Sequence, residues 1–149
     1  MFKEQFSVEW IVYVNVVIES GYAVSVQFDR KPVDERIKSN LVEKLKGDLE
    51  RYFDGGKVEF NYPVLLNTSE FIRRVLNETS KIPYGKTITY KELAERLDTK
   101  AYRAVGIALS KNPIPILIPC HRVVSKKGLG GYSSGVEIKR ELLKLEGVL

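Results

Sequence analysis

One cysteine and one histidine occur in the chain, and they are adjacent within the segment Pro119-Cys120-His121-Arg122-Val123. A thiol is a nucleophile only as the thiolate, and an unperturbed cysteine is only slightly ionised near pH 7. A neighbouring imidazole, a guanidinium and a proline that fixes the backbone favour a lowered thiol pKa. The alternative is that Cys120 is a small buried hydrophobe, as most lone intracellular cysteines are. The complete pentapeptide favours a nucleophile.

Composition indicates a globular protein. The chain has 149 residues, of which 44% are hydrophobic and 29% charged. A single cysteine allows no intramolecular disulfide, the N-terminus lacks the pattern of a signal peptide, and the apolar run 114–118 is too short to span a bilayer. We therefore expect a cytoplasmic protein without a membrane partner. No cluster of metal ligands is evident, so we expect no metal and no cofactor.

Charge is distributed unevenly along the chain. Residues 1–66 contain nine Lys and Arg against eleven Asp and Glu, whereas residues 67–149 contain fifteen against eight. A basic second half suggests that this half alone binds a polyanion. The alternative is a solvated surface with an excess of lysine, as in many thermophile proteins.

The pattern of residues 1–66 predicts strands followed by a helix, in a domain that shows no chemistry of its own. Apolar residues alternate over 8–18, Ser20-Gly21 supplies a turn, and alternation resumes over 22–28, which predicts a hairpin. Helical spacing extends over 34–53, and Lys57 to Phe60 could form one more short strand.

Residues 67–149 are predicted to form a second, helical domain. Asn67 with Glu70 and Thr89 with Glu92 each have the spacing of a capping box. A third helix follows, and its predicted buried stripe comprises Ala101, Ala104, Val105, Ala108 and Leu109. The last two helices have the proportions of a helix-turn-helix.

The outer face of the third helix is basic. It contains Lys100, Tyr102 and Arg103, with Lys111 at its end, and these could meet phosphates or bases. An ordinary helical pair with a solvated basic face is the alternative. Because the cysteine segment follows directly, the sequence places a nucleophile beside a surface suited to nucleic acid.

Several segments of this half resemble the O6-alkylguanine-DNA alkyltransferases, a family of DNA repair proteins that dealkylate guanine in a suicide reaction. The matching segments are Ile82-Pro83-Tyr84-Gly85-Lys86-Thr87, Tyr90-Lys91-Glu92-Leu93-Ala94, Arg103-Ala104-Val105-Gly106, Asn112-Pro113, Ile116-Leu117-Ile118-Pro119-Cys120-His121-Arg122-Val123-Val124, Leu129-Gly130-Gly131-Tyr132-Ser133 and Leu142-Leu143-Lys144-Leu145-Glu146-Gly147. They cover essentially all of residues 67–149, in order. The resemblance of residues 1–66 extends only to their layout.

The resemblance implies a catalytic role for five residues. Cys120 is similar to the alkyl acceptor, and His121 to the base that takes the thiol proton through a water. Glu146 would orient that histidine, which completes a nucleophile–base–orienter arrangement. Tyr90 resembles the phenol that donates a proton as guanine leaves, and Asn112 the amide that holds the turn carrying the cysteine.

The resemblance also implies contacts with the base and with DNA. Ser133 would contact O6, backbone carbonyls near Val123 would read the exocyclic amine, and Gly131 and Tyr132 would belong to the same pocket. Arg103 is similar to the arginine that fills the space left by a flipped nucleotide. The recognition helix would dock in the minor groove. The implied DNA-binding residues are Lys100, Ala101, Tyr102, Arg103, Lys111 and Tyr90.

The sequence therefore predicts a mixed α/β (α+β) protein with two domains. Residues 1–66 are expected to form a structural sheet-and-helix domain, and residues 67–149 a DNA-binding and alkyl-transfer domain with a winged-helix-like helix-turn-helix. The expected partner is double-stranded DNA containing O6-alkylguanine, bound by a monomer. Three alternatives stay open: a cysteine hydrolase or transferase, a non-catalytic protein that binds alkylated DNA, and a helix-turn-helix regulator.

Overall fold

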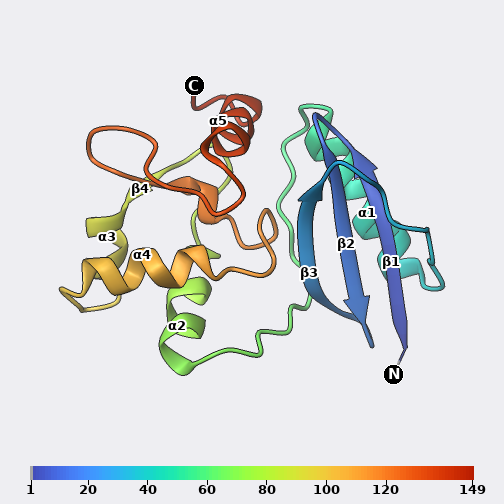
Figure 1. Cartoon of the computed structure of the whole chain (residues 1–149), viewed down its shortest axis with the longest axis horizontal. Coiled ribbons are helices and arrows are strands. Elements are labelled where there is room, and N and C mark those ends of the chain that lie inside the picture. Colours follow the sequence, from blue (N-terminus) through green and yellow to red (C-terminus); the bar gives the residue numbers. More distant parts are fainter. Residues whose placement is uncertain (1) are drawn as a thin grey trace. The chain divides into compact units, whose positions relative to one another are not determined.

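The computed structural model describes residues 2–149, and the chain divides into two compact units (Figure 1). The first unit comprises the described residues up to Leu66, and the second extends from Asn67 to Leu149. Helices and strands occur in both units, so the predicted mixed α/β class is confirmed. No helix in the described part of the chain is long and apolar enough to cross a membrane.

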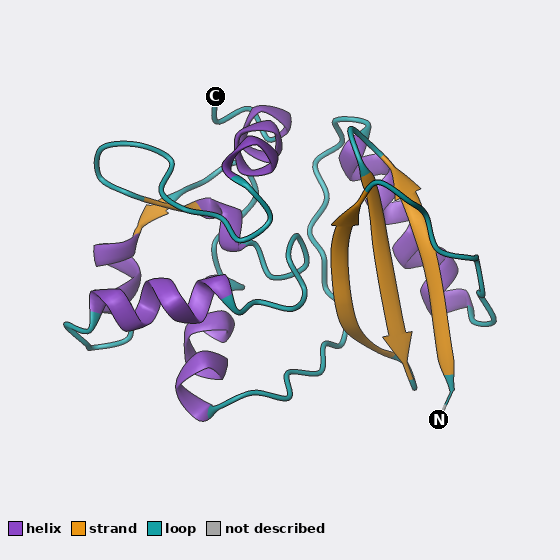
Figure 2. Ribbon diagram, viewed as in Figure 1, coloured by secondary structure: helices purple, strands orange, loops and turns teal. Residues whose placement is uncertain are grey.

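The first unit contains a three-stranded antiparallel sheet and one helix. The strands lie in the order β1 (Lys3–Glu9), β2 (Tyr13–Glu19) and β3 (Tyr22–Asp29). Helix α1 (Asn40–Phe53) covers one face of this sheet, as Figure 2 shows. Their apolar faces form a core that includes Phe6, Val14, Val16, Leu45, Leu49 and Tyr52.

Three predictions for this unit are wrong in detail. The alternating run 8–18 is two strands rather than one, because the Trp10 amide donates to the Val12 carbonyl at 2.9 Å and reverses the chain around the exposed Ile11. Helix α1 begins at Asn40 and not near residue 34, since the Ser39 side chain accepts from the Val42 amide and caps it. Residues 57–60 form no strand in the described structure.

The second unit packs helices around a two-stranded parallel sheet. Its helices are α2 (Glu70–Thr79), α3 (Tyr90–Arg96), α4 (Tyr102–Ser110), the 3-10 helix η1 (Cys120–Arg122) and α5 (Val136–Leu145). Strand β4 (Ile88–Thr89) pairs with β5 (Val123–Val124). Because β4 leads directly into α3 and β5 directly follows η1, this short sheet brings Tyr90 and Cys120 into one neighbourhood.

Local signals explain where the helices of this unit begin. Thr89 and Glu92 form the predicted capping box at α3. Helix α2 is capped by Ser69 and not by Asn67, since the extended backbone of Ser69 lets its hydroxyl accept from the Ile72 amide. Helices α3 and α4 form the predicted helix-turn-helix, but Ala101 is exposed and lies outside the buried stripe.

Candidate active site

Asn112 closes the loop that leads to the cysteine. Its Nδ2 donates to the Ile118 carbonyl at 2.9 Å, and its Oδ1 accepts from the Ile114 amide at 2.9 Å. Ile116 within this loop has a φ of 75°, which is strained for a β-branched residue. Together these bonds hold a strained, buried segment that ends at Cys120 in η1.

The Cys120 thiol is buried, with 8% of the residue exposed. Burial raises its pKa, while hydrogen bonds from Asn112 and Tyr132 and the charge of Lys139 act in the opposite direction. The predicted lowering of this pKa by flanking groups is therefore wrong for the free protein. The flanking arginine does not serve the thiol, because Arg122 turns toward Glu146 and the Ile82 carbonyl.

One carboxylate organises the buried polar groups behind the cysteine. Glu146 accepts from Nε and Nη2 of Arg122 at 2.8 and 3.1 Å, and from the Gly85 amide at 3.1 Å. Its Oε2 lies 2.6 Å from Nε2 of His121. The site thus includes a carboxylate–histidine pair with its charge balanced by a buried guanidinium.

This pairing determines which nitrogen of His121 is basic. Because Glu146 is an acceptor toward Nε2, that nitrogen holds the proton and Nδ1 keeps a lone pair. Nδ1 is buried and has no hydrogen-bond partner among the described residues. Burial lowers the pKa of His121, partly opposed by Glu146, so the ring is neutral near pH 7.

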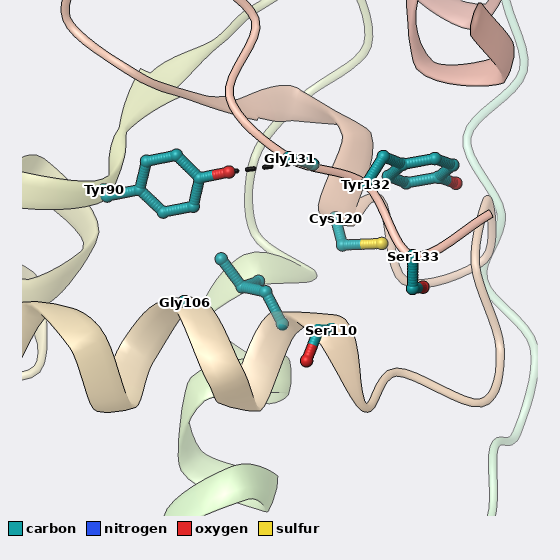
Figure 3. A pocket seen from close by; sticks show the side chains of 8 residues that line it. Tyr90, Gly106, Ser110, Cys120, Gly131, Tyr132 and Ser133 are labelled. Carbon is teal, nitrogen blue, oxygen red and sulfur yellow. Dashed lines mark hydrogen bonds between the residues drawn. The ribbon is translucent and has the colours of Figure 1, made fainter. Parts of the chain in front are cut away.

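A pocket of about 300 Å³ opens beside the thiol (Figure 3). The lining residues are Tyr90, Gly106, Leu109, Ser110, Cys120, Gly131, Tyr132 and Ser133. The Tyr90 hydroxyl donates to the Gly131 carbonyl at 3.5 Å, and burial raises the pKa of this phenol. A phenol with a raised pKa stays protonated at neutral pH and can donate a proton.

Most of the predicted substrate-binding residues meet in this pocket, with one exception. Gly131, Tyr132 and Ser133 line it, but Val123 does not. Val123 is fully buried, and its carbonyl accepts from Nζ of Lys139 at 2.7 Å. The expected contact of this carbonyl with the exocyclic amine stays a prediction, and it would have to share the carbonyl with the lysine.

Helix α4 presents one face to the pocket and another to solvent. Toward the pocket it presents Gly106, Leu109 and Ser110, which the sequence reasoning missed because they belong to an ordinary helical pattern. Toward solvent, at or beside its ends, lie five of the six predicted DNA-binding residues, all exposed: Lys100, Ala101, Tyr102, Arg103 and Lys111. The sixth, Tyr90, is half-buried and lines the pocket. The same short helix therefore connects an exposed basic surface to the wall of the pocket.

The fold and the site define a class of protein: a small α/β protein whose sole cysteine lies at a pocket walled by the second helix of a helix-turn-helix. The family described as 6-O-methylguanine DNA methyltransferase, DNA binding domain, matches residues 70–148. A methylated-DNA–protein-cysteine methyltransferase of Archaeoglobus fulgidus is 46% identical over 150 residues, covering 96% of this chain and 99% of the relative. A protein of the same name from Metallosphaera sedula is 46% identical over 137 residues, covering 91% and 87%. The chain belongs to the O6-methylguanine DNA methyltransferase family.

Solved structures agree with this assignment. The chain is similar to the O6-methylguanine methyltransferase of Mycobacterium tuberculosis, with a TM-score of 0.84, 29% identity and coverage of 97% of this chain and 93% of that one. The same protein in complex with DNA gives a TM-score of 0.80 at 29% identity, covering 94% and 90%. The enzyme of Pyrococcus kodakaraensis gives a TM-score of 0.74 at 27% identity, covering 99% and 100%.

Proposed function

We propose that this protein repairs O6-alkylguanine in duplex DNA by moving the alkyl group onto its own Cys120. The observation that carries the proposal is that the sole cysteine of the chain lies in the pocket walled by α4. Family membership supports the reaction class, because the relatives are named methylated-DNA–protein-cysteine methyltransferases. A pocket of about 300 Å³ is at the lower end of the range for small-molecule sites and suits one base.

Activation of the thiol is assigned to the buried pair of His121 and Glu146. Nδ1 of His121 takes the thiol proton, through a water, and the imidazolium that forms is stabilised by the carboxylate 2.6 Å from Nε2. The thiolate sulfur then attacks the alkyl carbon. A carbon–sulfur bond forms as the bond from carbon to O6 breaks.

Departure of guanine is assigned to Tyr90. A neutral base leaves far more readily than its anion, so a proton donated by the phenol lowers the barrier. In the net reaction the thiol proton ends on guanine, and Tyr90 and His121 return to their initial protonation states. The contact with O6 is assigned to Ser133, which lines the pocket together with Gly131 and Tyr132.

Docking on DNA is assigned to the exposed face of α4. Lys100 and Lys111 would meet phosphates, and Ala101 and Tyr102 would lie against the minor groove. Arg103 would occupy the space left by the nucleotide, which must be flipped because the reacting carbon lies within the base stack. We propose that the protein acts in the cytoplasm, and that it acts as a monomer because one exposed basic helix suffices for a single lesion.

The deciding experiment is the intact mass of the protein after incubation with duplex DNA containing O6-methylguanine. We expect a gain of one methyl group on the peptide that contains Cys120, reaching one equivalent per protein and then stopping, because thiol exchange does not reverse a thioether. Cys120→Ser should bind the same DNA without gaining mass. Sustained turnover, or methylation of the serine variant elsewhere, would overturn the proposal.

A further inference from the structure

Lys139 is a buried cation in the second unit, and it lies on α5 facing the cysteine segment. The residue is 0% exposed, and its Nζ donates to the Val123 carbonyl at 2.7 Å and to the Gly131 carbonyl at 3.0 Å. The same ammonium lies 5.8 Å from the centroid of the Tyr90 ring. Among the described residues, no carboxylate lies within ion-pair distance of Nζ of Lys139. The buried ion pairs of this part of the chain are those that Glu146 forms with His121 and Arg122.

An ammonium in such a place is unfavourable without a compensating anion. Buried lysines are rare, and burial lowers the pKa of Lys139 to about 8. Two carbonyl dipoles and a ring face offset only part of the cost of removing the charge from water. A neutral donor would connect the two carbonyls equally well, so hydrogen bonding alone does not account for a charged residue.

The proposed reaction supplies the missing anion, which is the thiolate of Cys120. The charge of Lys139 lowers the pKa of Cys120, and an ionised Cys120 raises the pKa of Lys139. The two groups therefore stabilise each other only when sulfur is the thiolate and nitrogen the ammonium. Arg122, the other buried cation near the thiol, is neutralised by Glu146.

We propose that Lys139 is a positioning residue for alkyl transfer, whose buried ammonium provides the positive charge that holds the Cys120 sulfur as thiolate. The inference rests on the proposed function and deepens it. Lys139 keeps its proton throughout, while His121 accepts the thiol proton. After sulfur is alkylated the anion no longer exists, and the ammonium is again without a counter-charge.

Other ionisable groups face Lys139 and must be distinguished from it. Cys120 and His121 approach from η1 and Tyr90 from α3, and the charge of Lys139 also lowers the pKa of His121. Arg122 and Glu146 lie beyond the histidine and are paired with each other. A test of Lys139 therefore requires variants that remove its charge and leave these groups in place.

The experiment compares wild type with Lys139→Met and Lys139→Gln. Glutamine keeps donors for the two carbonyls but has no charge, whereas methionine removes both. The measurement is the rate of alkyl transfer from free O6-benzylguanine between pH 6 and pH 10, which requires no DNA. Lys144→Met on the same helix, where the side chain is 53% exposed, is the matched control and should match wild type.

We expect both variants to react about tenfold more slowly than wild type at pH 7, which corresponds to a thiol pKa about one unit higher. The deficit should narrow as pH rises above 8, because the wild-type lysine loses its own proton there and the variant thiol ionises unaided. Recovery of the wild-type rate by glutamine, or a deficit that is constant with pH, would overturn the inference. Absence of transfer by wild type itself would instead overturn the proposed function.

A measurement on wild type alone covers the case in which neither variant folds. Nitrogen NMR of the lysine side chains should show Lys139 as the ammonium at pH 7 both before and after Cys120 is alkylated, because the proposed role requires the lysine to keep its proton throughout. A neutral Lys139 amine at pH 7 would contradict the inference.

Discussion

Oε2 of Glu146 lies 2.6 Å from Nε2 of His121, and neither side chain is exposed to solvent. The same carboxylate neutralises Arg122, so the proposed base and a structural cation share one buried anion. Chemistry and stability therefore depend on the same residue.

Glu146→Gln should lower both the rate of alkyl transfer and the stability of the fold. The amide still reaches His121, but Arg122 becomes a buried cation without an anion, and breaking such a pair costs about 3–5 kcal/mol. Urea unfolding gives the loss in stability, and single-turnover transfer gives the loss in rate. Glu137→Gln is the control, since its pair with Arg140 is exposed and worth about 1 kcal/mol or less. Equal stability of the two variants would contradict the network.

Acid should destabilise the protein through His121. Burial lowers the pKa of this ring in the folded state, so near and below its unfolded value of about 6.5 the unfolded chain binds more protons. The free energy of unfolding is therefore not reduced by His121 above about pH 6.5, and it falls as pH decreases toward the pKa of His121 in the folded protein. Urea unfolding between pH 5 and pH 8 measures the effect. His121→Gln should make stability depend less on pH in this range. If the variant's stability depended on pH as steeply as that of wild type, other groups would be responsible for the effect.

Arg103→Ala should slow repair of duplex DNA much more than transfer from free O6-benzylguanine. The residue is exposed on α4, outside the pocket lining, and the free base requires no flipping. The ratio of the two rates is the informative quantity, because damage common to both reactions cancels. Arg140→Ala on α5 provides a control with the same charge change. An equal loss with both substrates would make Arg103 a structural residue.

Lys100 and Lys111 should act on DNA through phosphates. Both are exposed beside α4, and each phosphate contact contributes about one unit to the slope of log affinity against log salt. Replacing either lysine by Gln should weaken binding to any sequence and reduce that slope by about one. Fluorescence anisotropy at several salt concentrations measures it, and a selective loss for lesion DNA would be the contrary result.

Gly130→Ala should damage the pocket through Tyr90. The backbone at Gly130 has a φ of 76°, and an added Cβ would lie 2.6 Å from the Tyr90 hydroxyl oxygen. We expect transfer from O6-benzylguanine to fall by about 10- to 100-fold, because a displacement of about 1 Å can have that effect. In Gly128→Ala, within the same loop, the new Cβ would meet only the Ser125 hydroxyl at 3.9 Å. Similar rates for the two variants would show that the phenol is not held in place by this contact.

The sequence predicted best where short-range signals determine structure. The capping box of Thr89 with Glu92 lies at the start of α3, and the turn at Ser20-Gly21, with positive φ at both residues, joins β2 to β3. It failed where a signal was ambiguous, since the alternation over 8–18 does not reveal the reversal around Ile11. Residues 136–145 were not identified as a helix, although they form α5.

The order of the segments along the chain predicted which residues meet at the site, but the sequence did not predict which of their neighbours are buried. The sequence predicted that Cys120, Tyr90 and Ser133 belong together, and one pocket contains all three. It could not reveal that Lys139 points inward, because lysine is normally exposed and helical spacing alone does not locate a buried cation. It also misjudged the thiol, because adjacency in sequence does not show that Arg122 is directed to another partner.

The buried, mostly protonated state of Cys120 affects how long an unused molecule stays competent. In the proposed reaction each molecule accepts one alkyl group, so a molecule whose Cys120 has reacted with another electrophile or oxidant can no longer repair DNA. Thiolate content and exposure govern such side reactions, and both are low here. A raised thiol pKa in the resting protein therefore slows the reaction of an unused molecule with stray electrophiles and oxidants.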